Sequence, residues 1–106
     1  MSDTELANAC VAHGVGYMET HYPANTPFYY HADCSMPMTA DEFVTKWPVA
    51  GALMEKMITG ELTIWRQAYD NDSPVWIVET HLTNADGRDE SLPRAITEAC
   101  AEALAG

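Results

Sequence analysis

The strongest constraint on the fold is the segment Val75–Leu82, whose β-branched and aromatic residues favour an extended strand. Just before it, residues 61–69 alternate between apolar and polar side chains, with Leu62 and Ile64 spaced by two. The connection 70–74, with the sequence Asp-Asn-Asp-Ser-Pro, is dense in turn-forming residues. This order predicts an antiparallel β-hairpin.

Helical patterns flank the hairpin. Ser2 and Glu5 have the spacing of a capping box, which predicts a helix over 3–13 that Gly14 ends. A second such signature, Thr39-Ala40-Asp41-Glu42, predicts a single helical turn at 40–46, and Pro48 suits the first turn of a main helix at 48–59. Ser91 precedes a last helix with one apolar face. That face comprises Leu92, Ala95, Ile96, Ala99, Cys100, Ala103 and Leu104.

The remaining segments are less regular. The aromatic run 28–34 predicts a strand near a sheet edge, residues after Gly14 leave open a further short strand, and 84–90 predicts a polar loop. The resulting order α-β-α-β-β-α predicts one small α+β domain over residues 1–106. We expect a sandwich-like fold with three helices packed on an antiparallel sheet of three to four strands.

Charge constrains the partners of this chain. Its 106 residues hold 16 Asp and Glu against 5 Lys and Arg, a net charge of −11, and residues 1–45 hold no Lys or Arg. Such a chain is repelled by nucleic acid and by anionic membranes and is attracted to basic protein surfaces. No apolar run approaches the roughly 18 residues of a membrane-spanning helix. The acidic residues 1–5 do not have the pattern of a secretory signal, so we expect a cytoplasmic protein.

Two sets of residues are candidates for a binding surface. The first is acidic and is expected to be exposed in turns and at helix starts: Asp33, Asp41, Glu42, Asp70, Asp72, Asp86, Asp89 and Glu90. The second is aromatic: Tyr17, Tyr22, Phe28, Tyr29 and Tyr30. These rings suit an interface, although they equally suit a small core. No Lys or Arg stands near them in the sequence, which argues against single-stranded nucleic acid as their ligand.

The cysteines and histidines raise the question of metal binding or catalysis. Cys10-x-x-His13 and His31-x-x-Cys34 have the spacing of zinc-ligand pairs. The competing interpretation is a histidine at a helix end and an inward-packed strand cysteine, and it is the one we favour. Cys10 and Cys100 are expected near the C-terminal ends of helices, which raises the pKa of a thiol, and Cys34 has no Lys or Arg within eleven residues. We therefore predict no metal, no cofactor and no enzymatic activity.

Two blocks of sequence resemble a known family. They are residues 43–56, in which Trp47 precedes a central helix, and residues 91–104, in which Pro93-Arg94-Ala95-Ile96 begins the closing helix. In these blocks the chain resembles the small phage and prophage proteins of the phage ABA-sandwich family. The resemblance implies a small α/β sandwich without an established activity, with Trp47 as a core anchor and Pro93 as a helix starter.

Together these observations lead to one expected function and two alternatives. We expect a phage- or prophage-encoded acidic accessory protein that binds a host protein with a basic surface in the bacterial cytoplasm. In that role it would inhibit a nucleic-acid-binding or defence protein by mimicking the charge of nucleic acid, without binding nucleic acid or membranes itself. The alternatives are a self-assembling structural protein, for instance a homodimer, and a small zinc-binding module.

Overall fold

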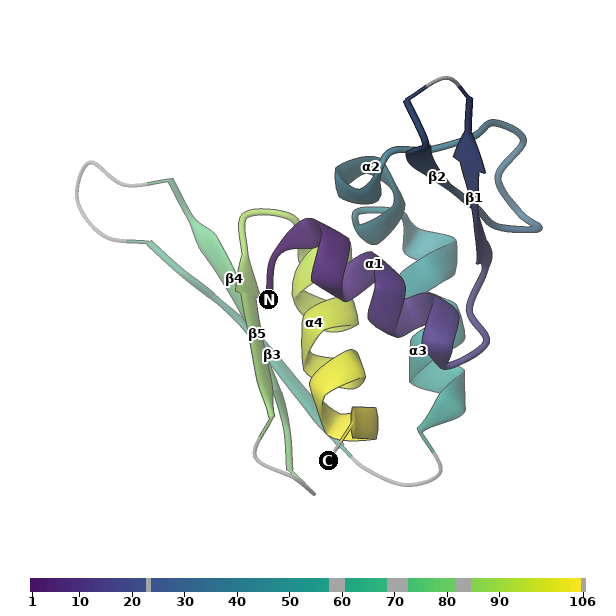
Figure 1. The fold of residues 1–106 in the computed structure, drawn as a ribbon. Coiled ribbons are helices and arrows are strands. Elements are labelled where there is room, and N and C mark those ends of the chain that lie inside the picture. The colour runs from purple at the N-terminus through teal and green to yellow at the C-terminus, as the bar shows by residue number, and fades with distance from the viewer. Residues whose placement is uncertain (23, 58–60, 69–72, 82–84, 106) are drawn as a thin grey trace.

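The computed structural model describes residues 1–22, 24–57, 61–68, 73–81 and 85–105. Within these residues the chain forms four helices and two antiparallel sheets (Figure 1). The elements are α1 (Asp3–Ala12), β1 (Tyr17–His21), β2 (Thr26–Tyr30), α2 (Ala40–Val44), α3 (Trp47–Lys56), β3 (Leu62–Gln67), β4 (Val75–Thr80), β5 (Asp86–Asp89) and α4 (Leu92–Ala105). The predicted α+β class is confirmed, although the prediction had three helices and one sheet.

The predicted hairpin forms the first two strands of the larger sheet, whose order is β3-β4-β5. The third strand, β5, contradicts the prediction of a polar loop at 84–90. It pairs antiparallel with β4, with Gly87 opposite Val78. The helix α4 then packs across β4 and β5 and covers one face of the sheet (Figure 1).

The smaller sheet is a hairpin of β1 and β2 at the other end of the molecule (Figure 1). The predicted strand at 28–34 is therefore displaced, because β2 covers residues 26–30 and the chain then leaves the sheet. Met38 returns to form an isolated bridge with Tyr29. Tyr29 itself is only 1% exposed and packs its ring on Phe43 of α2, with the ring centroids 5.4 Å apart.

The helix starts follow the sequence signals. Ser2 Oγ accepts a hydrogen bond from the Glu5 amide at 3.1 Å, and both predicted capping boxes are present. Pro93 lies buried in the first turn of α4, as expected. The expectation for Trp47 is wrong, because this side chain is 57% exposed at the start of α3. Phe43, from α2, occupies the core instead.

The core lies on both sides of α4. One side of this helix packs on the sheet, while α1 and α3 contact its other sides. The fully buried residues of the core include Leu6, Cys10, Val49, Leu53, Val78, Ala99 and Cys100. In the described part of the chain, no helix combines the length and the apolar character that crossing a membrane requires.

Candidate functional site

One face of the β1–β2 hairpin carries a group of rings, of which Tyr17 is exposed and Phe28 and Tyr30 are half-buried. Side chains alternate along a strand, so the register Tyr17 opposite Tyr30 and Glu19 opposite Phe28 places all four on the same face. The opposite face holds Tyr29, which faces the core. We call the outer set the aromatic face; it consists of Tyr17, Glu19, His21, Phe28 and Tyr30.

The rings of the aromatic face hold one another in place. Tyr17 and Tyr30 stack with centroids 4.9 Å apart and planes inclined by 8°. The ring of His21 lies 4.8 Å from that of Phe28, and its Nε2 is hydrogen-bonded to the Tyr30 hydroxyl at 2.8 Å. Rings fixed by such contacts lose little freedom when a partner binds, which makes the face suitable for recognition.

Glu19 places a carboxylate among these rings. Burial, then the charge of Glu19 and then Tyr17, raise the pKa of the Tyr30 hydroxyl. Within the described residues no ion pair involves Glu19, whose side chain is exposed. A carboxylate beside the faces of rings is a chemical environment that favours a cation.

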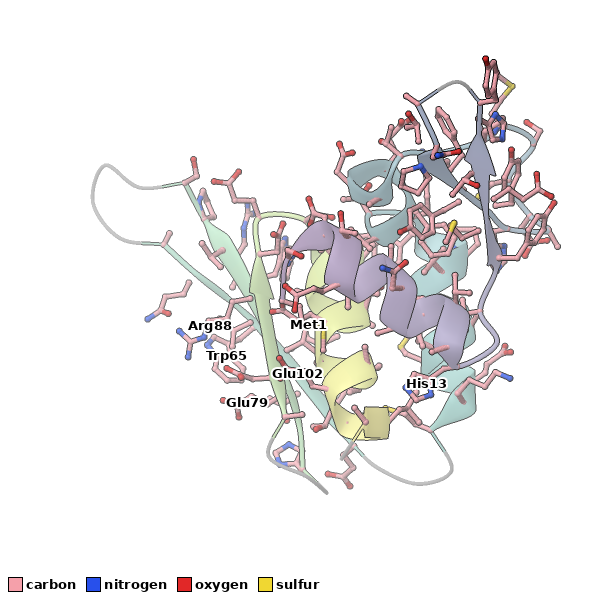
Figure 2. All side chains as sticks on the ribbon, viewed as in Figure 1. Met1, His13, Trp65, Glu79, Arg88 and Glu102 are labelled. Atoms are coloured by element: carbon pink, nitrogen blue, oxygen red, sulfur yellow. The ribbon has the colours of Figure 1, made fainter. Side chains whose placement is uncertain are left out.

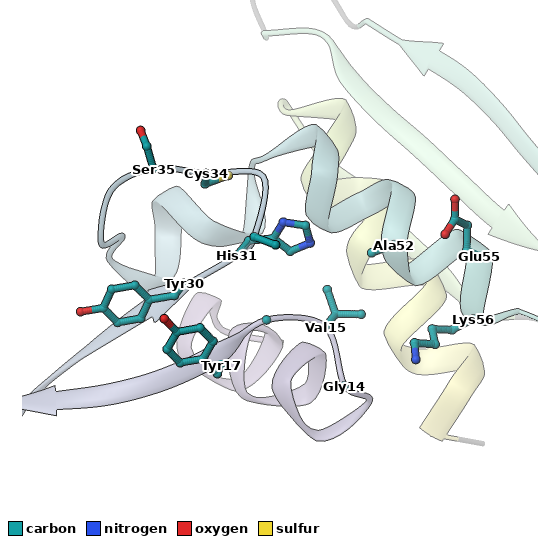
Figure 3. A pocket seen from close by; sticks show the side chains of 12 residues that line it. Gly14, Val15, Tyr17, Tyr30, His31, Cys34, Ser35, Ala52, Glu55 and Lys56 are labelled. Carbon is teal, nitrogen blue, oxygen red and sulfur yellow. The ribbon is translucent and has the colours of Figure 1, made fainter.

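A cleft of about 770 Å³ adjoins the aromatic face where the hairpin meets α3 (Figure 3). Its lining includes Tyr17, Tyr30, His31, Cys34, Glu55 and Lys56. Gly16 also lines the cleft, and its backbone lies close to that of Tyr30. Glycine is required there because φ is +74° and a Cβ would lie 2.5 Å from the Tyr30 carbonyl oxygen. The sequence suggested no cation near the rings, but folding brings Lys56 into the same cleft.

A second hollow of about 420 Å³ is lined by the loop that follows β2 and by residues in and after α2. It is lined by Asp33, Cys34, Glu42 and Lys46, among others. Two of the predicted acidic residues therefore come together here. Asp41 stands next to Glu42 in the first turn of α2, where a hydrogen bond from the Thr39 hydroxyl lowers the pKa of the Asp41 carboxyl.

The other predicted acidic residues lie elsewhere. Asp86 is paired with Arg88 at 3.4 Å on β5, at the opposite end of the molecule from the hairpin (Figure 1). Asp89 lies 3.4 Å from Arg94, and it also accepts the Ser91 amide at 2.9 Å. Glu90 follows as an exposed residue. Asp70 and Asp72 lie outside the described residues.

The aromatic candidates also separate in the structure. Tyr29 belongs to the core, Tyr22 is exposed next to the end of β1, and Tyr17, Phe28 and Tyr30 form the aromatic face. Neither Glu19 nor His21 was among the predicted binding residues. The signal was available, because the period-two alternation of a strand starting at Tyr17 places both on its face.

The two Cys/His pairs that the sequence offered as an alternative zinc site do not come together. Cys10 is buried within α1 and His13 caps its C-terminal end, whereas His31 and Cys34 belong to the loop after β2. Within the described part of the chain, no three His, Cys, Asp or Glu residues are placed to hold a metal ion.

The thiols are expected to differ in reactivity. Burial raises the pKa of the Cys10 thiol to about 12 and that of Cys100 to about 11, and the thiolate is the reactive form. We expect a thiol reagent at pH 8 to modify Cys34 quickly and the other two only on unfolding, as measured by mass spectrometry. The Cys34→Ser variant should then have no fast phase. Rapid modification of Cys10 in the native protein would contradict the buried placement.

The site therefore offers ring faces, a carboxylate among them and an open cleft at its border. These groups suit the recognition of a cationic side chain. No protein-family model matches this chain, and no curated protein or solved structure matches it either.

Proposed function

We propose that this protein is a non-enzymatic binding protein that attaches its aromatic face to a basic surface of another protein. The observation that carries the proposal is Glu19, an exposed carboxylate on the same face of the hairpin as Tyr17, Phe28 and Tyr30. An arginine or lysine of the partner would contact the ring faces and the carboxylate together. Tyr17 is 53% exposed, and a tyrosine ring adds contact area at a low entropic cost.

Charge supports the same partner chemistry. The net charge of −11 accelerates encounter with a basic surface and disfavours encounter with nucleic acid. Asp33, Asp41 and Glu42 are exposed on the loop after β2 and on α2, and they add to the negative charge of the molecule. Basic surfaces of this kind are typical of proteins that bind nucleic acid.

The resemblance to the phage ABA-sandwich family suggests where such a protein acts. We propose a phage- or prophage-encoded accessory factor in the bacterial cytoplasm. By covering the basic surface of a host protein, it would compete with nucleic acid for that surface. The acidic charge and the aromatic face support this role because both favour a partner with a basic surface.

Substitution of Glu19 tests the proposal. Affinity capture from bacterial lysate with elution in salt steps identifies the partner, and titration with the purified partner then gives the affinity. We expect Glu19→Gln to weaken binding about 10-fold, the order of a charge-assisted contact. Tyr17→Ser should weaken binding by at least as much, because it removes the ring that stacks on Tyr30.

Glu90→Gln is the matched control, since it removes the same charge from an exposed residue after β5. We expect this variant to bind within about two-fold of the unmodified protein. Equal losses at Glu19 and Glu90 would assign binding to overall charge instead of the aromatic face. Binding that persists unchanged at about 0.5 M salt would contradict a charge-assisted contact altogether.

A further inference from the structure

The edge strand β3 presents unpaired backbone groups on a defined set of residues. In an antiparallel pair, alternate residues bond to the neighbouring strand and the others point away from it. The amide of His81 donates to the Glu61 carbonyl at 3.3 Å, and the register pairs Thr63 with Glu79 and Trp65 with Ile77. It follows that the N–H and C=O groups of Leu62, Ile64 and Arg66 point away from β4.

The opposite edge of the same sheet is protected, whereas β3 is not. Natural edge strands are shielded by charges, short length, proline or a covering helix. β5 is four residues long, reads Asp-Gly-Arg-Asp and lies against α4. β3 is six residues long, contains no proline and only one charged residue, Arg66, and pairs with β4 without a bulge. Among the described residues no strand pairs with its outer edge.

Apolar side chains are exposed on both faces of this edge strand. Ile64 lies on the face of the sheet that α4 covers, but α4 packs over β4 and β5 and leaves the Ile64 side chain 42% exposed. Trp65 is 37% exposed on the other face, where Figure 2 shows it with Glu79 and Arg88 on the side of the sheet away from α4. A strand added at this edge would therefore cover apolar surface on both sides.

We propose that β3 pairs antiparallel with β3 of a second copy of this chain, with Ile64 opposite Ile64 across a two-fold axis. In this register Leu62 lies opposite Arg66 of the second copy, so every outward-pointing residue meets an outward-pointing residue. Each such pair exchanges both backbone hydrogen bonds. The two sheets become one continuous sheet with the order β5-β4-β3-β3-β4-β5. This inference is independent of the proposed function of the hairpin.

A second copy fits this edge both in symmetry and in local charge. The outward groups at 62, 64 and 66 are symmetric about Ile64, which is the condition for pairing of a strand with itself around a two-fold axis. Two chains of net charge −11 repel each other, but β3 has no carboxylate, and Arg66 lies opposite the apolar Leu62 of the second copy, so no like charges stand directly opposite each other at this edge. A strand pair is a small interface, so we expect a dimer that dissociates at micromolar concentration.

Sedimentation of the full chain from about 1 µM to about 1 mM tests the dimer. We expect a monomer at the low end and a dimer at the high end. Ile64→Lys should weaken dimerisation at least 10-fold, since it places two ammonium groups opposite each other. The substitution also makes the net charge less negative, so general repulsion cannot explain a loss. Trp47→Lys, at an exposed site on α3, makes the same change in charge and should leave the dimer intact.

The register is tested by cysteine substitutions along β3 in a Cys34→Ser background. Directly opposite residues in a hydrogen-bonded pair have Cα atoms about 5.5 Å apart, which suits a disulfide. On mild oxidation we expect Ile64→Cys to give the crosslinked dimer at least 10-fold faster than Leu62→Cys or Arg66→Cys. A cysteine at 62 or at 66 does not face its own copy in the dimer, because position 62 lies opposite position 66.

The remaining outcomes overturn the inference. A strict monomer at about 1 mM excludes the dimer. A dimer that resists Ile64→Lys, or that crosslinks fastest at another position, places the contact elsewhere. Far-UV circular dichroism establishes that each variant is folded, and the crosslinking series does not depend on tolerance of the lysine.

Discussion

Gly87→Ala is expected to lower the free energy of unfolding by about 3 kcal/mol. Gly87 lies in β5 where the strand touches the backbone of α4. A Cβ at this position would lie 2.0 Å from the Ala95 carbonyl oxygen and 2.8 Å from the Ala99 amide nitrogen. Backbone atoms of a packed helix cannot move aside cheaply, so the helix must shift away from the sheet. Denaturant unfolding followed by circular dichroism measures the loss.

Gly51→Ala is the matched control for that substitution. Gly51 lies within α3, and nothing stands within 4 Å of the position that its Cβ would take. Alanine is the better helix former, so we expect this variant to gain about 0.5–1 kcal/mol in the free energy of unfolding. Equal and small effects of the two substitutions would mean that α4 does not pack on β5 as described.

The same glycine shows why part of the fold could not be predicted. Residues 84–90 have the composition of a loop, and nothing local distinguishes them from one. β5 forms because β4 offers an edge to pair with and because Gly87 lets α4 approach. Both causes are tertiary. The hairpin β3–β4 and the helix α4 were predictable because alternation and an apolar face are local signals.

The candidate site was predictable to a similar extent. Composition identified the aromatic segment, but it could not tell Tyr29, in the core, from Tyr17, on the outer face. That distinction requires the strand register, which also places Glu19 among the rings. Lys56 could not be assigned to the cleft at all, since it stands far from the hairpin in sequence and reaches it only through the packing of α3.

Arg94→Met is expected to produce the second large loss, about 2 kcal/mol of the free energy of unfolding. The Arg94 side chain is only 13% exposed, and its Nε donates to Asp3 at 2.7 Å. It also lies 3.4 Å from carboxylate oxygens of Asp89 and Glu98. The guanidinium thus links the start of α1, the end of β5 and α4. Partial exposure of the carboxylates reduces the cost below that of a fully buried pair.

We expect a much smaller loss of stability at Arg88, because both members of its ion pair are exposed. The Arg88 guanidinium pairs with Asp86, also at 3.4 Å, and the two side chains are 60% and 47% exposed. We therefore expect Arg88→Met to change the free energy of unfolding by less than about 0.5 kcal/mol. The nitrogen–oxygen distance in this pair equals that in two of the Arg94 pairs. A difference between the two variants therefore reports the burial of the arginine and the number of carboxylates around it, and not the length of the ion pair. Unfolding measured at low salt and at about 0.5 M salt separates the two further, because salt screens the exposed pair and leaves most of the Arg94 effect. Similar losses for both variants would mean that α1 is not fastened to α4 through Arg94.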